Sequence, residues 1–391
     1  ALSVMTQDLP ATADVVVAGG GVMGASTAYH LARMGAGRVV LVEREGYLGE
    51  MSTGQCAGGI RHQFSTETNV RLSKESIAMM ERFPEELGQP LDIDLCGYLI
   101  LLTDERDVAV FRENVALQRR LGVETEWLDP EQVHERIPLV NTDGVLAATY
   151  YDRDGLADPG GVVQGYATAA RGLGVTIATG CEVTGIETAS GRIRAVETTR
   201  GRIETPVVVN ACGAWAPHLG AMVGVEIPIR PIRRQIVSTT PIPGLPPDFP
   251  FVVFFGTSLY LHREGEGILS GKSNNDEEPG FKLEVDEEWE AVHMMELMER
   301  FPAVEEAGIR ARWAGLYEVT PDAHPIFGRV SPVEGFYVMA GFSGHGFMHG
   351  PVMGLLMAEE ILEGEARTVP VGEFRYERFL TGDLSPEYNV I

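Results

Sequence analysis

The hydrophobic pattern of the chain begins with two short apolar runs on either side of a helical segment. Residues 14–18 and 39–42 are almost continuously apolar, and residues 25–34 between them carry apolar side chains at helical spacing. Such runs, separated by about ten helical residues, predict two parallel strands joined by a helix. Glycines fill the turn from the first strand into the helix, at positions 19–21 and 24.

Helical and strand-like patterns alternate through the rest of the chain. Three strand-like runs between residues 182 and 204 are separated by the turn pairs Ser190-Gly191 and Arg200-Gly201, which predicts a three-stranded meander. Further helices are predicted at 66–86, 107–121, 130–136, 158–173, 284–301 and 351–362. Further strands are predicted at 98–102, 175–179, 207–213 and 336–340.

This alternation over 391 residues is typical of two closely joined domains. We predict an α/β fold in which a Rossmann-like dinucleotide-binding domain is interleaved with an α+β substrate domain built on a mixed or antiparallel sheet. The dinucleotide-binding domain is assigned to residues 1–90, 147–225 and 311–391. The substrate domain is assigned to residues 91–146 and 226–310.

Composition narrows the function classes. The formal net charge of −25 disfavours nucleic acid as a partner, because both would be anionic. No run of about 18 apolar residues occurs, so no membrane span is expected. The four cysteines form no C-x-x-C pair, which argues against a zinc or thioredoxin-type site, and they favour a reducing, cytoplasmic location. No metal site is expected.

The glycine cluster has the spacing of a dinucleotide-binding turn. Gly19 permits the tight turn, Gly21 lets the backbone approach a pyrophosphate, and Gly24 lets the helix pack close to the strand. The helix N-terminus adds free N–H groups and partial positive charge. Glu43, at the end of the second apolar run, would accept hydrogen bonds from a ribose. The alternative is a purely structural glycine turn.

A second glycine-rich segment, residues 341–350, lies between a predicted strand and a predicted helix. Its backbone N–H groups could face an electron-rich flavin ring and stabilise negative charge there, or the segment could be a simple connector. The first glycine motif does not by itself distinguish NAD from FAD. FAD is favoured because that motif is near the N-terminus and the domain is completed by distant segments.

Together these segments resemble the D-amino-acid-oxidase superfamily of flavoproteins over essentially the whole chain. The most similar branch is the group of sarcosine oxidase, dimethylglycine dehydrogenase and the proline dehydrogenase beta subunit. This resemblance implies an FAD-binding domain of the glutathione-reductase type. The motifs that carry it are VVVAGGGVMGASTAYHLA, STGQCAGGIRHQF, VVVNACGAW, GLYEVTPDAHPIFG and AGFSGHGFMHGP.

The resemblance also implies roles for particular residues. Arg61 falls where the family holds the substrate carboxylate, a task that suits the two parallel donors of a guanidinium; a structural ion pair is the alternative. Tyr317 falls on the family's active-site tyrosine, and Tyr260, His345 and Met348 complete the catalytic candidates. The implied FAD contacts are Gly19, Gly21, Val22, Met23, Gly24, Glu43, Arg44, Ser52, Thr53, Gln55, Gly58, Val183, Ala211, Gly213, Trp215, Gly344, His345, Gly346, Phe347 and Met348.

The chain departs from the family pattern at several positions. Gly315 and Gln55 stand where relatives attach the flavin to a cysteine or a histidine, so we expect non-covalent FAD. Met348 replaces a lysine that helps to hold the carboxylate in sarcosine oxidases, which favours the proline dehydrogenase type. Leu269 stands at the position of the oxygen-activating lysine, and Lys272 on the same strand is expected to face elsewhere. We therefore expect slow reaction with oxygen.

The predicted function is FAD-dependent oxidation of a secondary or N-methylated amino acid, such as sarcosine, dimethylglycine or proline. A hydride would pass from the carbon beside nitrogen to flavin N5 and give an imine. The alternatives are a 2-hydroxy-acid or glycine-type oxidase on the same fold, or a non-catalytic FAD-binding assembly factor. The electron acceptor (oxygen, a quinone or a partner redox subunit) and the homo- or hetero-oligomeric state are left open.

Overall fold

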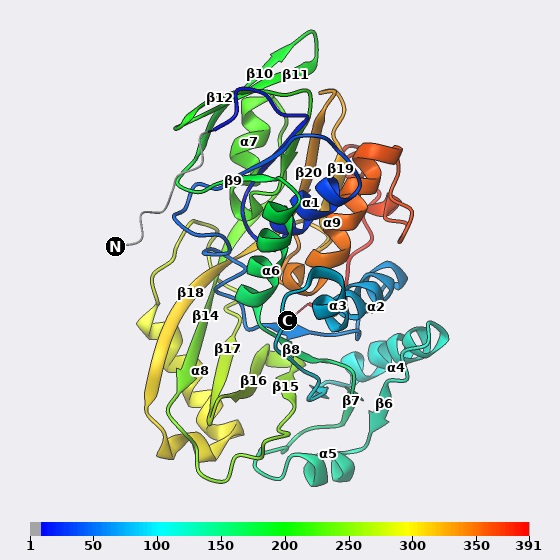
Figure 1. Cartoon of the computed structure of the whole chain (residues 1–391). Coiled ribbons are helices and arrows are strands. Elements are labelled where there is room, and N and C mark those ends of the chain that lie inside the picture. The colour runs from blue at the N-terminus through cyan, green and yellow to red at the C-terminus, as the bar shows by residue number, and fades with distance from the viewer. Residues whose placement is uncertain (1–8, 391) are drawn as a thin grey trace.

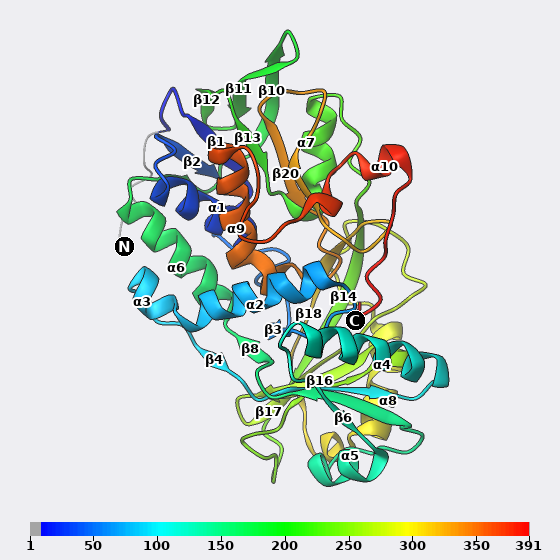
Figure 2. The ribbon, with the colours of Figure 1, turned by 90° about the vertical axis from the view of Figure 1, so that its right-hand side faces the viewer.

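The computed structural model describes residues 9–390 of the chain. Residues 1–8 and 391, which the sequence analysis assigns to the dinucleotide-binding domain, lie outside the described residues. Its strands form two large sheets, which Figure 1 shows one above the other, with most helices packed on their faces. Figure 2, turned by 90°, shows the helices α1, α6 and α9 packed together against one face of the upper sheet. The α/β fold class predicted from the sequence is confirmed.

The upper sheet has six strands and is mostly parallel. β1 pairs in parallel with both β2 and β13, and β19 is antiparallel to β20 at one edge. The predicted unit of two strands and a helix therefore lies at the centre of the sheet. In spatial order the strands are β19 (Ile326–Arg329), β20 (Phe336–Ala340), β13 (Val208–Asn210), β1 (Val15–Ala18), β2 (Val39–Val42) and β9 (Thr176–Ala178).

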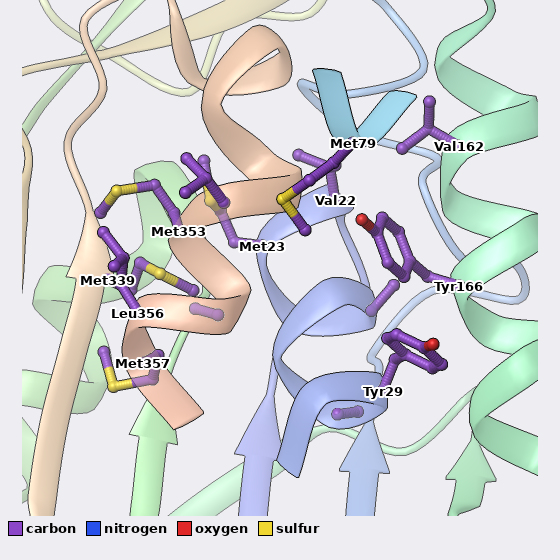
Figure 3. Close-up of a cluster of buried hydrophobic side chains, with 14 of the residues drawn as sticks. Val22, Met23, Tyr29, Met79, Val162, Tyr166, Met339, Met353, Leu356 and Met357 are labelled. Carbon is purple, nitrogen blue, oxygen red and sulfur yellow. The ribbon is translucent and has the colours of Figure 1, made fainter. Parts of the chain in front are cut away.

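Strand alternation gives the six-stranded sheet two different apolar faces. Val15 and Val17 belong to a core with four helices, whereas Val16 and Ala18 belong to a core with the meander and a short helix. Figure 3 shows the first core, where side chains of α1, α6 and α9 meet. Those helices are α1 (Val22–Arg33), α2 (Glu67–Glu81), α6 (Pro159–Gly172) and α9 (Gly346–Glu363). The other face carries β10 (Val183–Ala189), β11 (Arg192–Thr198), β12 (Gly201–Glu204) and α7 (Ala216–Met222).

The lower sheet has eight strands and is largely antiparallel. Its helices are α4 (Glu105–Arg120), which packs on one face, and α5 (Pro130–Arg136) and α8 (Glu287–Arg300), which pack on the other. In spatial order the strands are β18 (Ile309–Val319), β14 (Arg230–Thr239), β17 (Gly267–Lys272), β16 (Leu259–Glu264), β15 (Phe251–Phe254), β5 (Tyr98–Leu102), β7 (Ala147–Tyr151) and β6 (Glu126–Leu128). A small sheet of β3 (Gly59–Ile60), β8 (Gly155–Ala157) and β4 (Ile93–Asp94) completes the strands.

The predicted division into two discontinuous domains stays a proposal. Two of its boundaries fall at or inside strands of the eight-stranded sheet. β7, placed by prediction in the dinucleotide-binding domain, pairs with β5 and β6, and β18, cut by the boundary at residue 311, pairs with β14 along its length. Sheet pairing therefore places both strands with the predicted substrate domain.

Helix α9 begins earlier than predicted. The sequence suggested a loop to residue 350 and a helix from Pro351, but the helix starts at Gly346 and Pro351 lies inside it. Tertiary packing explains the difference, because a Cβ on Gly350 would lie 2.4 Å from Val22 of α1, so the first turn of α9 is pressed against α1. Within residues 9–390, no helix is both long and apolar enough to cross a membrane.

The contact between α1 and α9 generates a stability prediction. A Cβ on Gly354 would lie 2.1 Å from Ser26 Oγ and 2.6 Å from the Ser26 backbone, so Gly354→Ala should lower the free energy of unfolding by about 1–3 kcal/mol. The control is Gly172→Ala at the end of α6, where no atom lies within 4 Å and stability should be unchanged or raised by up to about 1 kcal/mol. Urea unfolding measures both, and equal effects would contradict the packing.

Candidate functional site

The turn from β1 into α1 is built from backbone in close contact. Gly19 has a φ of +105°, and a Cβ there would lie 2.3 Å from the carbonyl oxygen of Ala211, while a Cβ on Gly24 would lie 1.8 Å from that of Gly19. Gly21, the N-cap of α1, has no side chain to bond the first N–H groups; the Val22 N–H donates to Thr53 Oγ1 at 3.2 Å, and the first turn has no acidic residue. The N–H groups and positive end of α1 are therefore suited to a phosphate group.

Glu43 follows β2 and faces the same turn. Its carboxylate accepts hydrogen bonds from the N–H of Gly20 at 2.6 Å and from the N–H of Glu45 at 2.7 Å. These bonds fix the carboxylate at the rim of the cavity described next. Its predicted contact with a ribose stays a prediction.

A large cavity of about 280 Å³ lies along the glycine turn. Its lining includes Val183 at the start of β10 and Tyr317 on β18. A cavity of this size beside an anion-binding turn is suited to a dinucleotide. Of the predicted cofactor contacts, the cavity is lined by Gly19, Gly21, Val22, Met23, Glu43, Arg44, Ser52, Thr53, Val183, Ala211, Gly213, Trp215, Gly344, Gly346 and Phe347.

A smaller cavity of about 90 Å³ adjoins the first. The structure brings all five catalytic candidates together in its lining, although they come from distant parts of the chain. Four of the predicted cofactor contacts also lie here rather than in the large cavity: Gln55, Gly58, His345 and Met348. The catalytic candidates are Arg61, Tyr260, Tyr317, His345 and Met348. Both cavities are lined by Ser52, Cys56, Leu316, Tyr317, Gly344 and Phe347, so these residues form the wall at which their contents meet.

Arg61 is held firmly in the small cavity. Its side chain is buried, with the guanidinium 3.9 Å from the centre of the Phe64 ring. One terminal nitrogen donates to the carbonyl of Gln63 at 2.6 Å and the other to that of Asn389 at 2.5 Å. A guanidinium has five N–H groups, so two bonds leave donors for a ligand. Val390, next to Asn389, also lines the cavity.

Apart from Arg61 and a second arginine, Arg234, the titratable groups of the small cavity are neutral near pH 7. Burial raises the pKa of the Tyr317 and Tyr260 phenols, and burial together with the Arg61 charge lowers the pKa of His345 to about 3. The His345 Nε2 atom is buried and has no hydrogen-bond partner among the described residues. No acidic side chain of residues 9–390 lines this cavity. Its fixed charge is therefore positive, which suits an anionic ligand.

Several lining residues were not predicted from the sequence. In the small cavity they include Arg234, Tyr98, Phe251 and Val390, and in the large cavity Glu318. The signal for Arg234 was available, since two consecutive arginines on a strand must point to opposite sides of the sheet. Val390 and Phe251 offered no such signal. Lys272 points away as predicted, because it pairs with Glu296 at 2.8 Å.

Comparison with known proteins agrees with this geometry. The family model described as FAD dependent oxidoreductase matches residues 14–360. The chain is 34% identical to FAD-dependent oxidoreductase domain-containing protein 1 of Bos taurus, over 98% of this chain and 88% of that protein. It is 32% identical to mitochondrial sarcosine dehydrogenase of Mus musculus, over 92% of this chain but only 40% of that protein. The crystal structure of L-proline dehydrogenase from P.horikoshii superimposes with a TM-score of 0.89 and 35% identity, covering 96% of this chain and all of that one.

Glu318 generates a prediction about pH. Burial raises the pKa of this carboxyl from 4.5 to about 7, an effect that hydrogen bonds from the Gly341 and Phe342 N–H groups only partly offset. Between those pH values the folded protein keeps a proton that the unfolded chain has lost, so stability falls as pH rises from about 4.5 to 7. The loss is at most about 3 kcal/mol.

The measurement compares the wild type with Glu318→Gln, which mimics the neutral carboxyl. Unfolding midpoints at pH 5 and pH 7.5 should show a larger drop for the wild type than for Glu318→Gln. Parallel pH profiles for the two proteins would contradict the raised pKa.

Proposed function

We propose that this chain, which belongs to the family of FAD-dependent oxidoreductases, oxidises a small secondary or N-methylated amino acid at the carbon beside its nitrogen. The observation that carries the proposal is the small cavity, which has Arg61 in its lining, no described acidic side chain, and a wall shared with the large cavity. The similarity to L-proline dehydrogenase and sarcosine dehydrogenase supports it.

The large cavity fits FAD. The backbone turn at Gly19 and Gly24 leaves no room for side chains, and the N-terminus of α1 would hold the two phosphates. Glu43 would accept hydrogen bonds from the ribose, and N–H groups around Gly344 and Gly346 would face the flavin end. When bound, FAD supplies the two-electron redox chemistry that amino-acid side chains lack. We retain non-covalent attachment as part of the proposal, because Gly315 and Gln55 offer no thiol or imidazole.

The size of the small cavity limits the substrate. A water-sized group needs about 10–15 Å³ of such volume, so about 90 Å³ holds roughly six to nine non-hydrogen atoms. Sarcosine and proline fall within this range. Amines with long chains or large rings do not.

The charges of the small cavity favour a neutral amine with a carboxylate. Arg61 provides charge-assisted hydrogen bonds for the carboxylate. No described acidic side chain is present to pair with an ammonium group, and His345 is neutral. An amine would therefore bind deprotonated, with its nitrogen lone pair available, and no strong base is needed in the cavity. The protein contributes position and electrostatics.

Other features of the proposal concern the setting of the reaction. Leu269 replaces the oxygen-activating lysine of related oxidases and Lys272 is bound to Glu296, which supports an acceptor other than oxygen, either a quinone or a partner redox subunit. The four cysteines are free thiols, which supports the predicted cytoplasmic location. The number and kind of subunits stay part of the prediction.

The proposal predicts which compounds reduce the bound flavin. Under anaerobic conditions, proline, sarcosine, dimethylglycine or glycine should bleach the flavin absorbance band, with a secondary or tertiary amine faster than glycine. Lactate serves as the 2-hydroxy-acid control and should leave the band unchanged. Bleaching by lactate alone would favour the hydroxy-acid alternative, and no bleaching by any compound would favour the assembly-factor alternative.

Removal of the Arg61 charge should weaken substrate binding. Arg61→Met should raise KM for the active amine about tenfold to hundredfold, because a hydrogen bond to a charged group contributes about 1.5–3 kcal/mol. Arg71→Met is the control, since Arg71 lies in an exposed pair with Glu67 on α2. An unchanged KM in Arg61→Met would remove this residue from the binding site. Melting temperatures show whether loss of its bond to Asn389 also destabilises the fold.

A further inference from the structure

A second arginine lines the small cavity. Arg234 extends from β14, and its guanidinium carbon lies 5.0 Å from the centre of the Tyr317 ring. One terminal nitrogen donates to the carbonyl of Arg233 at 3.0 Å and, more weakly, to that of Asn274 at 3.4 Å. Its Nε atom is buried and has no hydrogen-bond partner in the described part of the chain. The side chain is thus held in place at the cavity by groups that do not neutralise it.

Arg233, the preceding residue on β14, has carboxylate partners that neutralise its charge. Arg233 points to the opposite side of β14 and donates to carboxylates of Glu277 at 2.8 Å and Asp286 at 3.0 Å. Arg378, buried elsewhere, pairs with Asp322 at 2.7 Å. None of the described acidic side chains lies within salt-bridge distance of Arg234, although the chain has 56 acidic residues against 31 basic ones. A partly buried charge without a counter-charge is costly, and a ligand anion would remove that cost.

The surroundings of Arg234 differ from those of Arg61. Arg61 lies against Phe64 and the carbonyl of Asn389, whereas Arg234 stacks on Tyr317. Tyr317 is within electrostatic range of both guanidinium groups, since each opposes the rise of its phenol pKa. Gln55, in the same lining, has a buried side-chain oxygen without a partner among the described residues, which could accept a hydrogen bond from an amine. The cavity therefore has two separate cationic positions and an acceptor.

We propose that Arg234 forms a second anion-binding position in the small cavity, so that the preferred substrate is a secondary amine with two carboxylates. One carboxylate would bind Arg61, the other Arg234, and the nitrogen would lie between them. An N-carboxymethyl amino acid such as iminodiacetate has nine non-hydrogen atoms, the upper end of the size range derived from the cavity volume. The amine part of this inference rests on the proposed function, whereas the anion-binding position does not.

Two non-oxidisable probes test the anion position directly in the FAD-loaded protein. Oxydiacetate has two carboxylates and methoxyacetate has one on an otherwise similar ether. Their dissociation constants are measured by the change in flavin absorbance and, independently, by the rise in melting temperature with ligand concentration. Oxydiacetate should bind at least tenfold more tightly than methoxyacetate.

Three variants test whether Arg234 causes the preference for oxydiacetate over methoxyacetate. Arg234→Met should lower the oxydiacetate preference about tenfold to hundredfold, which corresponds to the loss of a hydrogen bond to a charged group. Arg234→Lys keeps the charge and should restore most of the preference. Arg233→Met, with its side chain on the other side of β14, should retain it. The inference is overturned if oxydiacetate binds no better than methoxyacetate, or if Arg234→Met and Arg233→Met reduce the preference equally.

Reduction of the flavin then separates the two proposals. Iminodiacetate should reduce it with a lower KM than sarcosine, and Arg234→Met should raise the KM for iminodiacetate more than that for sarcosine. If sarcosine or proline reduces the flavin and Arg234→Met leaves the ratio of the two KM values unchanged, the proposed function stands and the second anion position fails. If no amine reduces the flavin but oxydiacetate binding depends on Arg234, the anion position stands and the proposed function fails.

Discussion

The backbone contact between the first glycine turn and the strand end at Ala211 is the constraint on which the rest of the structure depends. Because Gly19 touches the carbonyl of Ala211 and Gly24 touches that of Gly19, β1, β13 and the start of α1 meet without side chains between them. This contact leaves the N-terminus of α1 in the lining of the large cavity, beside the Thr53 hydroxyl that accepts from the Val22 N–H at 3.2 Å. Glycines also allow close packing between α9 and α1, at Gly350 and Gly354. This packing places the turn before α9, with Gly344 and Gly346, in the lining of the large cavity.

Electrostatics define the second level of organisation. The chain as a whole is strongly acidic, yet the small cavity is lined by two arginines and by none of the described acidic side chains. Glu318, which lines the large cavity, has its pKa raised by burial to about 7, so it adds little negative charge below neutral pH. The small cavity therefore carries positive charge within a chain whose formal net charge is −25, which suits an anionic ligand.

Arg61 connects the small cavity to a segment that no local pattern marked as important. Arg61 donates to the carbonyl of Asn389, near the C-terminus. The neighbouring Glu387 is fixed in turn, because its carboxylate accepts from the Ser65 N–H at 2.7 Å and from the Asn69 side chain at 2.9 Å. Numerous hydrogen bonds therefore position Val390 as part of the cavity wall. Arg61, which we propose as the partner of the substrate carboxylate, is thus also a structural link between the first and last parts of the chain.

The sequence by itself determined the elements whose causes are local. The strand, glycine turn and helix around residues 15–33, the meander after residue 182, and the capped start of α6 at Asp158 all follow from neighbouring residues. The resemblance to a known family also named five residues that the structure places in one small cavity. Only the tertiary structure decided the start of α9 at Gly346, since that depends on packing against α1 rather than on the local position of Pro351. It also decided that Arg234 faces the cavity while Arg233 pairs with acids, because the side of a strand that is buried depends on which sheet it joins and not on the strand's own residues.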